Sequence, residues 1–297
     1  MNTFENLFKP RNTLLMTLLA TAFVAGCGGG GGGGDGGVAA VAAASAAAAG
    51  AGPTGAVCTG AGCVSLGAAG NYVILAKTGV STIPNSVVTG NVGLSPAAGS
   101  FLTGWSETAN GAPVTYTTSA QVAAPGKLYA ANYSGGTTSV DLTTAVADME
   151  TAHTAANGMA PAGGGDPAVG GTACPGTGAL GGLTLTPGVY TCTTLVSIAT
   201  GTNVTLSGAG VYVIRTTQGI SQASGTQVIL ANGALAQNVF WVPALTVNIV
   251  GTAGATTRMA GVILAKTDIV VGTNATVNGR LLAQTAVTLD QSTVTTP

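Results

Sequence analysis

The chain has 297 residues, of which 48 are Gly, and only 6% of its residues are charged and 4% are aromatic. Its net charge at pH 7 is −1 and it has no basic cluster, so binding to nucleic acid is not expected. Abundant Gly together with many Thr, Val and Ala is typical of short strands that are joined by tight turns.

The N-terminal residues have the composition of an export signal. Lys9 and Arg11 precede an apolar run over 14–24, which leads through Ala25 and Gly26 to Cys27. A basic segment, a short apolar segment and small residues before a cysteine predict a lipoprotein signal peptide over 1–26 and lipidation of Cys27. An ordinary secretory signal with an incidental cysteine is the alternative, whereas the run is too short to favour a membrane-spanning helix.

This signal predicts an exported protein that is attached to a membrane through an N-terminal lipid anchor. Gly28, in place of an Asp after the cysteine, favours an outer-membrane lipoprotein or a cell-surface protein, with secretion as the alternative. The Gly- and Ala-rich segment over 27–57 predicts a flexible tether. The folded domain is expected to occupy 58–297 and to be monomeric.

Four further cysteines lie outside the export signal. Cys58 and Cys63 are close in sequence, and Cys174 and Cys192 flank an insertion. Since an exported compartment permits disulfides, we predict the pairs Cys58–Cys63 and Cys174–Cys192, with free buried thiols as the alternative. There is no Cys-x-x-Cys spacing and a single histidine, so no metal site and no cofactor are expected.

An eight-residue phrase occurs twice, as VILAKTGV over 73–80 and as VILAKTDI over 262–269. Weaker copies of the block begin at residues 189, 211, 239 and 280, so successive late blocks start 18 to 28 residues apart. This loose period predicts a mostly β, triangular β-solenoid whose coils fold by stacking on their neighbours. The early copy is separated from the others, so the later coils must return beside it and the solenoid is discontinuous.

The segment between the early and late copies changes character. Pro and Gly interrupt the repeat over 95–136, and this insertion is expected to cap one end of the solenoid and protect its strand edges. Apolar residues at three- and four-residue spacing then predict a helix over 139–157, with Ser139 or Asp141 as N-cap and Asn157-Gly158 as the stop. The apolar stripe that should face the solenoid comprises Leu142, Ala145, Val146, Met149, Ala152 and Ala156.

Each coil should contribute three strands. The first strand is apolar on both sides, so its outer side needs a cover, and the helix is the natural one. The second strand alternates apolar residues with small or hydroxyl residues, and its outward ladder is expected to comprise Ser81, Ser197, Ser221, Asn248, Val270 and Thr288. The third strand is expected to give another ladder of Thr205, Ile229, Thr276 and Thr293.

Some β-solenoids are polysaccharide lyases or hydrolases, which need paired carboxylates, a basic residue or a calcium site. Asp268 and Asp290 are the acidic residues within the coils, and they form no convincing pair, so no catalytic residue is assigned. Lys77 and Lys266 occupy equivalent places in the repeat and are interpreted as solvated strand ends. His153, near the end of the predicted helix, is interpreted as a surface or capping residue.

Several segments, in order over about 64–297, resemble the microbial ice-binding proteins that have a discontinuous β-solenoid. They are LGAAGNYVILAKTGVST from Leu66, GKLYAANY from Gly126, LTTAVADMETAH from Leu142, GGLTLTPGVY from Gly181, GVILAKTDI from Gly261 and NGRLLAQTAVTLDQSTVTTP from Asn278. The resemblance implies a right-handed triangular solenoid, a long helix packed alongside and an N-terminal coil inserted among later ones. The strings over 200–203 and 285–288 are similar to a Thr-small-x-Thr/Asn pattern of some members.

The resemblance also implies an antifreeze function, in which a flat sheet face adsorbs to ice and inhibits ice growth and recrystallisation. By position after the VILAK strand, that face is the one formed by the second strands. The expected ice-contacting residues are Ser81, Ser197, Ser221, Thr246, Asn248, Val270, Thr285 and Thr288. A lipid-anchored adhesin or structural module that binds glycan or protein through the same face is the alternative.

Overall fold

The computed structural model describes residues 56–58, 60, 62–160 and 174–297. The chain divides into two units, Met1–Ala43 and Ala44–Pro297, and every described residue belongs to the second. The predicted signal peptide, Cys27 and nearly all of the predicted tether lie outside the described residues. No helix in the described ranges has the length and apolar character needed to cross a bilayer.

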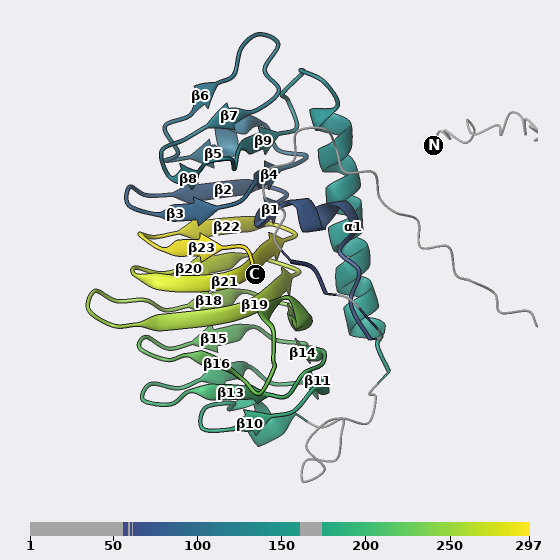
Figure 1. Ribbon diagram of the computed structural model, residues 1–297, viewed down its shortest axis with the longest axis vertical. Coiled ribbons are helices and arrows are strands. Elements are labelled where there is room, and N and C mark those ends of the chain that lie inside the picture. The colour runs from purple at the N-terminus through teal and green to yellow at the C-terminus, as the bar shows by residue number, and fades with distance from the viewer. Residues whose placement is uncertain (1–55, 59, 61, 161–173) are drawn as a thin grey trace, which may run out of the picture. The chain divides into compact units, whose positions relative to one another are not determined.

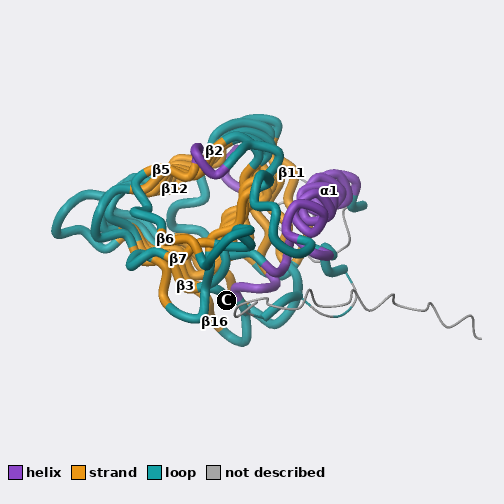
Figure 2. Tube along the Cα trace, turned by 90° about the horizontal axis from the view of Figure 1, so that it is seen from above, coloured by secondary structure: helices purple, strands orange, loops and turns teal. Residues whose placement is uncertain are grey.

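The second unit is a mostly β solenoid with one long helix beside it, as predicted (Figure 1). Figure 2 looks along the solenoid and shows the strands gathered on three sides of a shared interior. We name these sides face A, which the helix covers, face B, which is a seven-stranded sheet, and face C. Within each coil the chain passes from face A to face B to face C, and neighbouring coils pair in parallel.

The strands of face A, in stacking order, are β11 (Gly188–Cys192), β14 (Tyr212–Thr216), β17 (Val239–Pro243), the later parts of β19 (Thr257–Ala265) and β21 (Ala275–Ala283), β1 (Ile74–Ala76), β4 (Val92–Leu94) and β9 (Leu128–Ala130). Those of face B are β12 (Val196–Ile198), β15 (Ile220–Gln222), β18 (Val247–Ile249), β20 (Ile269–Val271), β22 (Ala286–Leu289), β2 (Gly79–Thr82) and β5 (Leu102–Thr103). Those of face C are β10 (Thr184–Leu185), β13 (Val204–Ser207), β16 (Val228–Ala231), the earlier parts of β19 and β21, β23 (Thr293–Thr295), β3 (Val87–Thr89) and β8 (Val122–Ala123). Short 3-10 helices are η1 (Gly67–Asn71), η2 (Gly99–Phe101), η4 (Pro175–Gly178) and η5 (Ala236–Asn238).

The first coil stacks on the last one, which makes the solenoid discontinuous. On face A, Ile74 of β1 pairs with Leu281 of β21 on one side and with Val92 of β4 on the other. On face B, β2 pairs in the same way with β22 and with β5. The first coil is therefore inserted between two later segments, as expected: the last coil on one side and the segment that directly follows it on the other.

The two VILAKT copies lie two coils apart. Ala76 of the early copy pairs with Ala283, and Ala283 pairs with Ala265 of the late copy. The lysines that follow behave differently: Lys266 is exposed, whereas Lys77 forms an ion pair of 2.6 Å with Glu150 of the helix. Lys77 thus lies at a strand end and its side chain is 31% exposed, and the passing helix gives it an ion-pair partner that the sequence did not predict.

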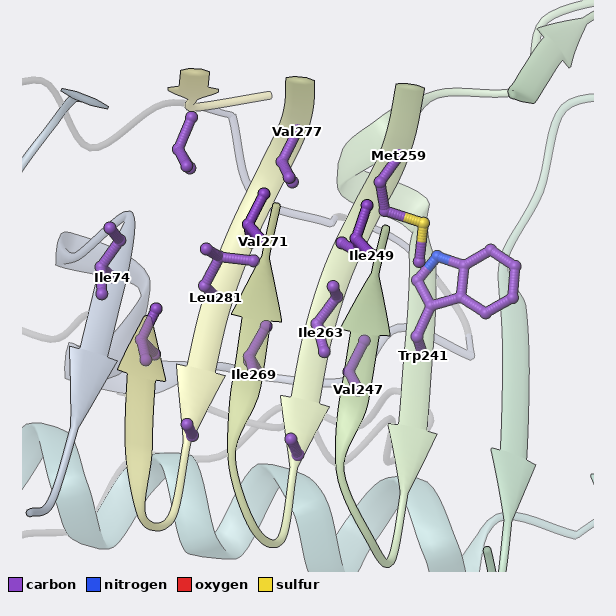
Figure 3. Packing of buried hydrophobic residues seen from close by; sticks show 14 of the residues in the cluster. Ile74, Trp241, Val247, Ile249, Met259, Ile263, Ile269, Val271, Val277 and Leu281 are labelled. Atoms are coloured by element: carbon purple, nitrogen blue, oxygen red, sulfur yellow. The ribbon is translucent and has the colours of Figure 1, made fainter. Parts of the chain in front are cut away.

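The interior is filled by the inward side chains of all three faces. In Figure 3, Ile74, Leu281 and Ile263 point from face A into the same core as Val247, Ile249, Ile269 and Val271 from face B. These side chains are fully buried, and each such aliphatic residue contributes about 1.5–3 kcal/mol relative to an exposed one. Most are β-branched, so they have few rotamers to lose in the packed stack.

Helix α1 (Thr138–Gly158) covers face A and extends one residue beyond the predicted range at each end. It begins after Thr137, whose hydroxyl donates to the Asp141 carboxylate at 2.7 Å, so the prediction of Ser139 or Asp141 as N-cap is wrong. The apolar stripe packs on the solenoid as predicted, with Val146 only partly buried. Its partners are outward side chains of face A, namely Val189, Val213, Phe240, Val242, Val262, Leu264 and Leu282.

His153 belongs to the buried side of α1, so its interpretation as a surface or capping residue is wrong. It is only 7% exposed, and its Nε2 lies 3.5 Å from the Pro243 carbonyl oxygen of β17. The reason is its place one residue after Ala152, which keeps it on the side that faces the sheet. Burial lowers the pKa of this imidazole below its ordinary value, with nearby Lys266 acting in the same direction.

The segment over 95–136, expected as a cap, has two parts. Strands β6 (Thr108–Ala109) and β7 (Thr117–Thr118) pair antiparallel beyond β9, at one end of the solenoid (Figure 1). Before them, β5 pairs in parallel with β2 and extends face B by one coil. Trp105, which lies between the two parts, is attached to the first coil, because its buried indole donates to the Val80 carbonyl of β2 at 3.0 Å.

Both predicted disulfides are confirmed. Cys58 and Cys63 are bonded in the segment that precedes the first coil, with their Cα atoms 5.6 Å apart. Cys174 is bonded to Cys192 of β11, which ties η4 to the terminal coil. The second bond closes a loop over the solenoid end opposite the β6–β7 pair.

Candidate functional site

Face B carries one unbroken column of outward side chains, which we name the ladder. In stacking order it comprises Ser197, Ser221, Asn248, Val270, Thr288, Ser81 and Thr103. The strand register thus brings together all six predicted ladder residues and adds Thr103. Their contact with ice stays a prediction.

The ladder side chains are short, uncharged and evenly spaced. Neighbouring strands lie about 4.8 Å apart, so seven coils give a row roughly 29 Å long. Ser81 donates a hydrogen bond of 3.2 Å to Thr288, which links the first coil to the last along the row. The β-branched members have few rotamers, so their methyl and hydroxyl positions vary little.

The backbone beneath the ladder is held by the core. Asn248 lies between Val247 and Ile249, and both of these inward neighbours are 0% exposed. Thr288 lies in the same way between Val287 and Leu289, which are also 0% exposed. Because both flanking side chains are locked in the interior, the outward atoms are fixed before any ligand binds.

A second outward column lies two residues before the ladder in each coil. It comprises Leu195, Gly219, Thr246, Asp268, Ala286, Gly79 and Phe101. The predicted site residue Thr246 lies here, and its hydroxyl donates to the Asp268 carboxylate at 2.8 Å. Asp268 is the one charged residue of the two columns, and this bond satisfies part of its hydrogen-bonding capacity.

The predicted site residue Thr285 lies outside the sheet, in the turn before β22. Its carbonyl accepts the Thr78 amide at 2.9 Å, and its own amide donates to the Thr267 carbonyl at 3.3 Å. These bonds stack three threonines along the edge where face A turns into face B. Exposed Thr78 is an additional candidate that the sequence reasoning missed, whereas the hydroxyl of Thr267 is buried.

The missed residues can be found by aligning, in each coil, the four residues that end at the ladder member, which we call a tetrad. Each ladder member ends a tetrad: TLVS over 194–197, QGIS over 218–221, LTVN over 245–248, TDIV over 267–270, TAVT over 285–288, TGVS over 78–81 and SFLT over 100–103. The third residue of every tetrad is apolar and buried. The last tetrad was hidden by its place within the expected cap.

Large apolar side chains are also exposed on face B and its margins. Ten such side chains stand out on the described residues, and five of them are Ile83, Phe101, Leu195, Leu245 and Val250. Phe101 and Leu195 are more than half exposed, at 56% and 51%, and each directly precedes an end strand of the sheet, β5 and β12 respectively.

Face C differs from face B. Thr205 pairs with Ile229, and Thr276 pairs with Thr293, but these pairs belong to two different columns. Arg258 pairs with Thr276 on one side and forms a β-bridge with Gln227 on the other. The column of Thr276 therefore continues to Gln227, two residues before Ile229. The prediction of one continuous third-strand ladder is therefore wrong. The chain between β16 and β19 shifts the register, so that Thr276 and Thr293 do not continue the column of Thr205 and Ile229.

The string over 200–203, which resembles the Thr-small-x-Thr/Asn pattern, lies in a turn. Residues 200–203 connect β12 to β13, and Gly201 adopts a φ of 78°, which favours glycine. The Thr202 hydroxyl donates to the Ala199 carbonyl at 2.6 Å, within the same turn. This string therefore stabilises a corner and adds nothing to the ladder.

The two coil carboxylates are both engaged by threonine hydroxyls. Asp268 accepts from Thr246, and Asp290 accepts from Thr273 at 2.9 Å. Across the described ranges, no group of three or more His, Cys, Asp or Glu side chains is arranged to hold a metal ion. The chemistry of face B is thus that of hydroxyl, amide and methyl groups, which bind water and apolar surfaces.

Fold and site together define a discontinuous β-solenoid protein whose face B carries a nearly uncharged outward row. A family model described as Ice-binding-like matches residues 74–295. An ice-binding protein of Flammulina populicola is 41% identical over 242 residues, which cover 82% of this chain and 92% of that protein. The chain belongs to the Ice-binding-like family.

Solved structures agree with this assignment. A glycosylated ice-binding protein from an Arctic yeast is similar with a TM-score of 0.70 and 38% identity, over 79% of this chain and 94% of that one. The domain of an ice-binding protein from Shewanella frigidimarina is similar with a TM-score of 0.66 and 27% identity, over 78% and 96%.

Proposed function

We propose that the protein binds ice through face B and thereby inhibits ice growth and recrystallisation. The observation that carries the proposal is the ladder, seven short and uncharged side chains in unbroken parallel register. Family membership and the names of the relatives support ice as the ligand. No enzymatic activity is assigned.

The ladder acts on ice through ordered water. Hydroxyl groups of Ser and Thr and the amide of Asn248 hydrogen-bond water, while the methyl groups of Thr288 and Val270 order the water around them. Each water-mediated contact is weak, since immobilising one water costs up to about 2 kcal/mol. A rigid face lowers the further cost of ordering side chains on binding, so many weak contacts add up.

Adsorption then affects crystal growth. Ice can advance only between bound molecules, so its front becomes curved, and a curved front melts at a lower temperature than a flat one. Small crystals with pinned surfaces also exchange water more slowly with large ones. Both effects follow from attachment and require no bond to be made or broken.

Direct observation of ice crystals in dilute purified protein tests the proposal. We expect faceted, shaped crystals and slow recrystallisation. Normal unshaped growth together with unimpeded recrystallisation would contradict ice binding. In that case the adhesin or structural alternative is tested by measuring glycan or protein binding to face B.

We also propose that the mature chain is exported and held at a membrane by a lipid on Cys27. The signal-like composition of 1–26 supports this, and the two disulfides suit an oxidising compartment. Labelling with a fatty acid is expected in the parent and lost in Cys27→Ser. Equal labelling of both would exclude lipidation at this residue.

A further inference from the structure

The segment that precedes the first coil is bound firmly to the solenoid. Val64, Leu66 and Ala69 are buried in the same apolar cluster as the helix stripe and the outer side of face A. The Ala68 amide donates to the Asp148 carboxylate of α1 at 2.7 Å. This segment therefore belongs to the folded domain and determines where the chain enters it.

Arg280 holds the start of that segment. It lies on the outer side of face A, directly after Gly279 at the corner where β21 leaves face C, and it is 0% exposed. Its guanidinium donates to the Gly70 carbonyl at 3.3 Å and 3.2 Å and to the Ala56 carbonyl at 2.9 Å. A buried charge is costly unless its donors are satisfied, so these carbonyls must remain in place.

Ala56 is also fixed on its other side. Its amide donates to the Pro297 carbonyl at 3.0 Å, and Pro297 follows β23 of face C. Ala56 therefore lies at the corner between faces C and A. In a three-sided solenoid this corner is opposite face B, and Figure 2 shows the C-terminal end on the far side of the molecule from β2, β5 and β12.

We propose that Arg280 is a positioning residue that fixes the entry point of the chain opposite the ladder, so that attachment through the N-terminus to a lipid surface leaves face B free to bind ice. The inference rests on the proposed ice binding by face B. It adds a second attachment, to lipid, and makes the protein a connector between a membrane and ice.

The place of Ala56 carries the argument. Ala56 lies at the corner opposite face B, so the body of the solenoid separates it from the ladder. An attachment made upstream of Ala56 therefore need not cover the row.

The test uses the chain from Cys27 onward, whose other cysteines are bonded, coupled through the Cys27 thiol to fluorescent vesicles that carry maleimide lipids. A second chain lacks 28–53, so that attachment occurs close to Ala56. A third combines Cys27→Ser with Ser221→Cys and is attached through the ladder. Adsorption of each vesicle to a growing ice surface is measured, and each uncoupled chain is tested for ice shaping in solution.

Both chains that are coupled through Cys27 are expected to bring vesicles to ice, with capture at least tenfold above that of the ladder-coupled chain. Loss of capture by the shortened chain, when the same chain shapes ice in solution, would overturn the inference and leave ice binding intact. Equal capture by the ladder-coupled chain would overturn it as well. An uncoupled parent that does not shape ice would reject the proposed function, and the inference with it.

The role of Arg280 has its own readout. Arg280→Met is expected to accelerate amide hydrogen exchange over residues 62–72 at least tenfold, whereas ice shaping in solution stays at the parent level. Ala56→Pro removes only the amide that binds Pro297, and it is expected to accelerate the same exchange even if Arg280→Met does not fold. Parent-like exchange in Ala56→Pro, or in a folded Arg280→Met, would show that these contacts do not fix the entry point.

Discussion

The hydroxyl of Ser81 donates to that of Thr288 at 3.2 Å, although the two residues are 207 positions apart in the chain. The bond joins β2 to β22, at the place where the first coil stacks on the last. The continuity of the ladder therefore depends on tertiary stacking across this junction. Ice binding should be sensitive to changes on either side of it.

Replacing Thr288 by Tyr is expected to abolish ice shaping and inhibition of recrystallisation. A ring standing out of the row prevents close approach of neighbouring ladder members to a flat crystal surface, while the core beneath is unchanged. Far-UV circular dichroism and the melting temperature should remain near those of the parent. Thr205→Tyr on face C is the matched control and should retain activity; loss in both variants would argue against a specific role of face B.

Thr103→Tyr tests whether the ladder extends into the segment that the sequence placed in the cap. Because Thr103 pairs with Ser81 in β2, we expect a clear decrease in recrystallisation inhibition, smaller than for Thr288 because Thr103 is the end member. Thr108→Tyr, in exposed β6, is the control and should behave as the parent. An unaffected Thr103 variant would place the limit of the active face at Ser81.

Leu142→Ala is expected to lower the free energy of unfolding by about 2–5 kcal/mol, because it leaves a cavity between α1 and face A. Val140 is on the exposed side of the helix, and Val140→Ala should change stability by less than about 0.5 kcal/mol. Denaturant titration of both variants measures the difference. Similar values for the two would mean that the helix is not held by its apolar stripe.

Removing the Cys174–Cys192 bond by a double Ser substitution should cost about 3 kcal/mol, compared with about 2 kcal/mol for the shorter Cys58–Cys63 loop. The two bonds have sequence separations of 18 and 5. The longer loop restricts the unfolded chain more, and its bond ties η4 to the end coil. Denaturant titration of each double variant against the parent checks the order, and the reverse order would refute an account based on loop length.

His153 gives a pH dependence whose sign is fixed by its lowered pKa. The unfolded chain takes up a proton below about pH 6.5, whereas the buried imidazole resists protonation, so the stability of the fold falls as the pH is lowered through this range. His153→Gln should flatten the dependence below about pH 6.5. Parallel stability curves for variant and parent would contradict this assignment.

Local patterns were sufficient to predict face B and six of the seven ladder residues. Alternation of buried and short polar residues gave the correct inward and outward sides for Ser197, Asn248 and Thr288, because a strand permits only two sides. The same pattern missed Thr103, where Phe101 occupies a place that is small or polar in most coils. A bulky residue there obscured the repeat.

Features that depend on how distant segments pack together were harder to predict from the sequence. The VILAKT copies predicted that the late coils return beside the first one, and the pairing of β1 with β21 confirms this. They did not specify β4 as its other neighbour. The side to which His153 turns depends on how α1 lies across β17. The break in the face C columns arises from the length of the loop before β19, a change of alignment that single strands do not encode.

Adsorption to ice tests the central claim most directly. A fluorescently labelled parent and the double variant Ser197→Tyr/Thr288→Tyr are offered to a slowly growing single ice crystal, and the fluorescence incorporated into the ice is measured. We predict that the parent coats and enters the ice while the equally folded double variant remains in the liquid. Equal incorporation of the two chains would show that ice is bound by a surface other than face B.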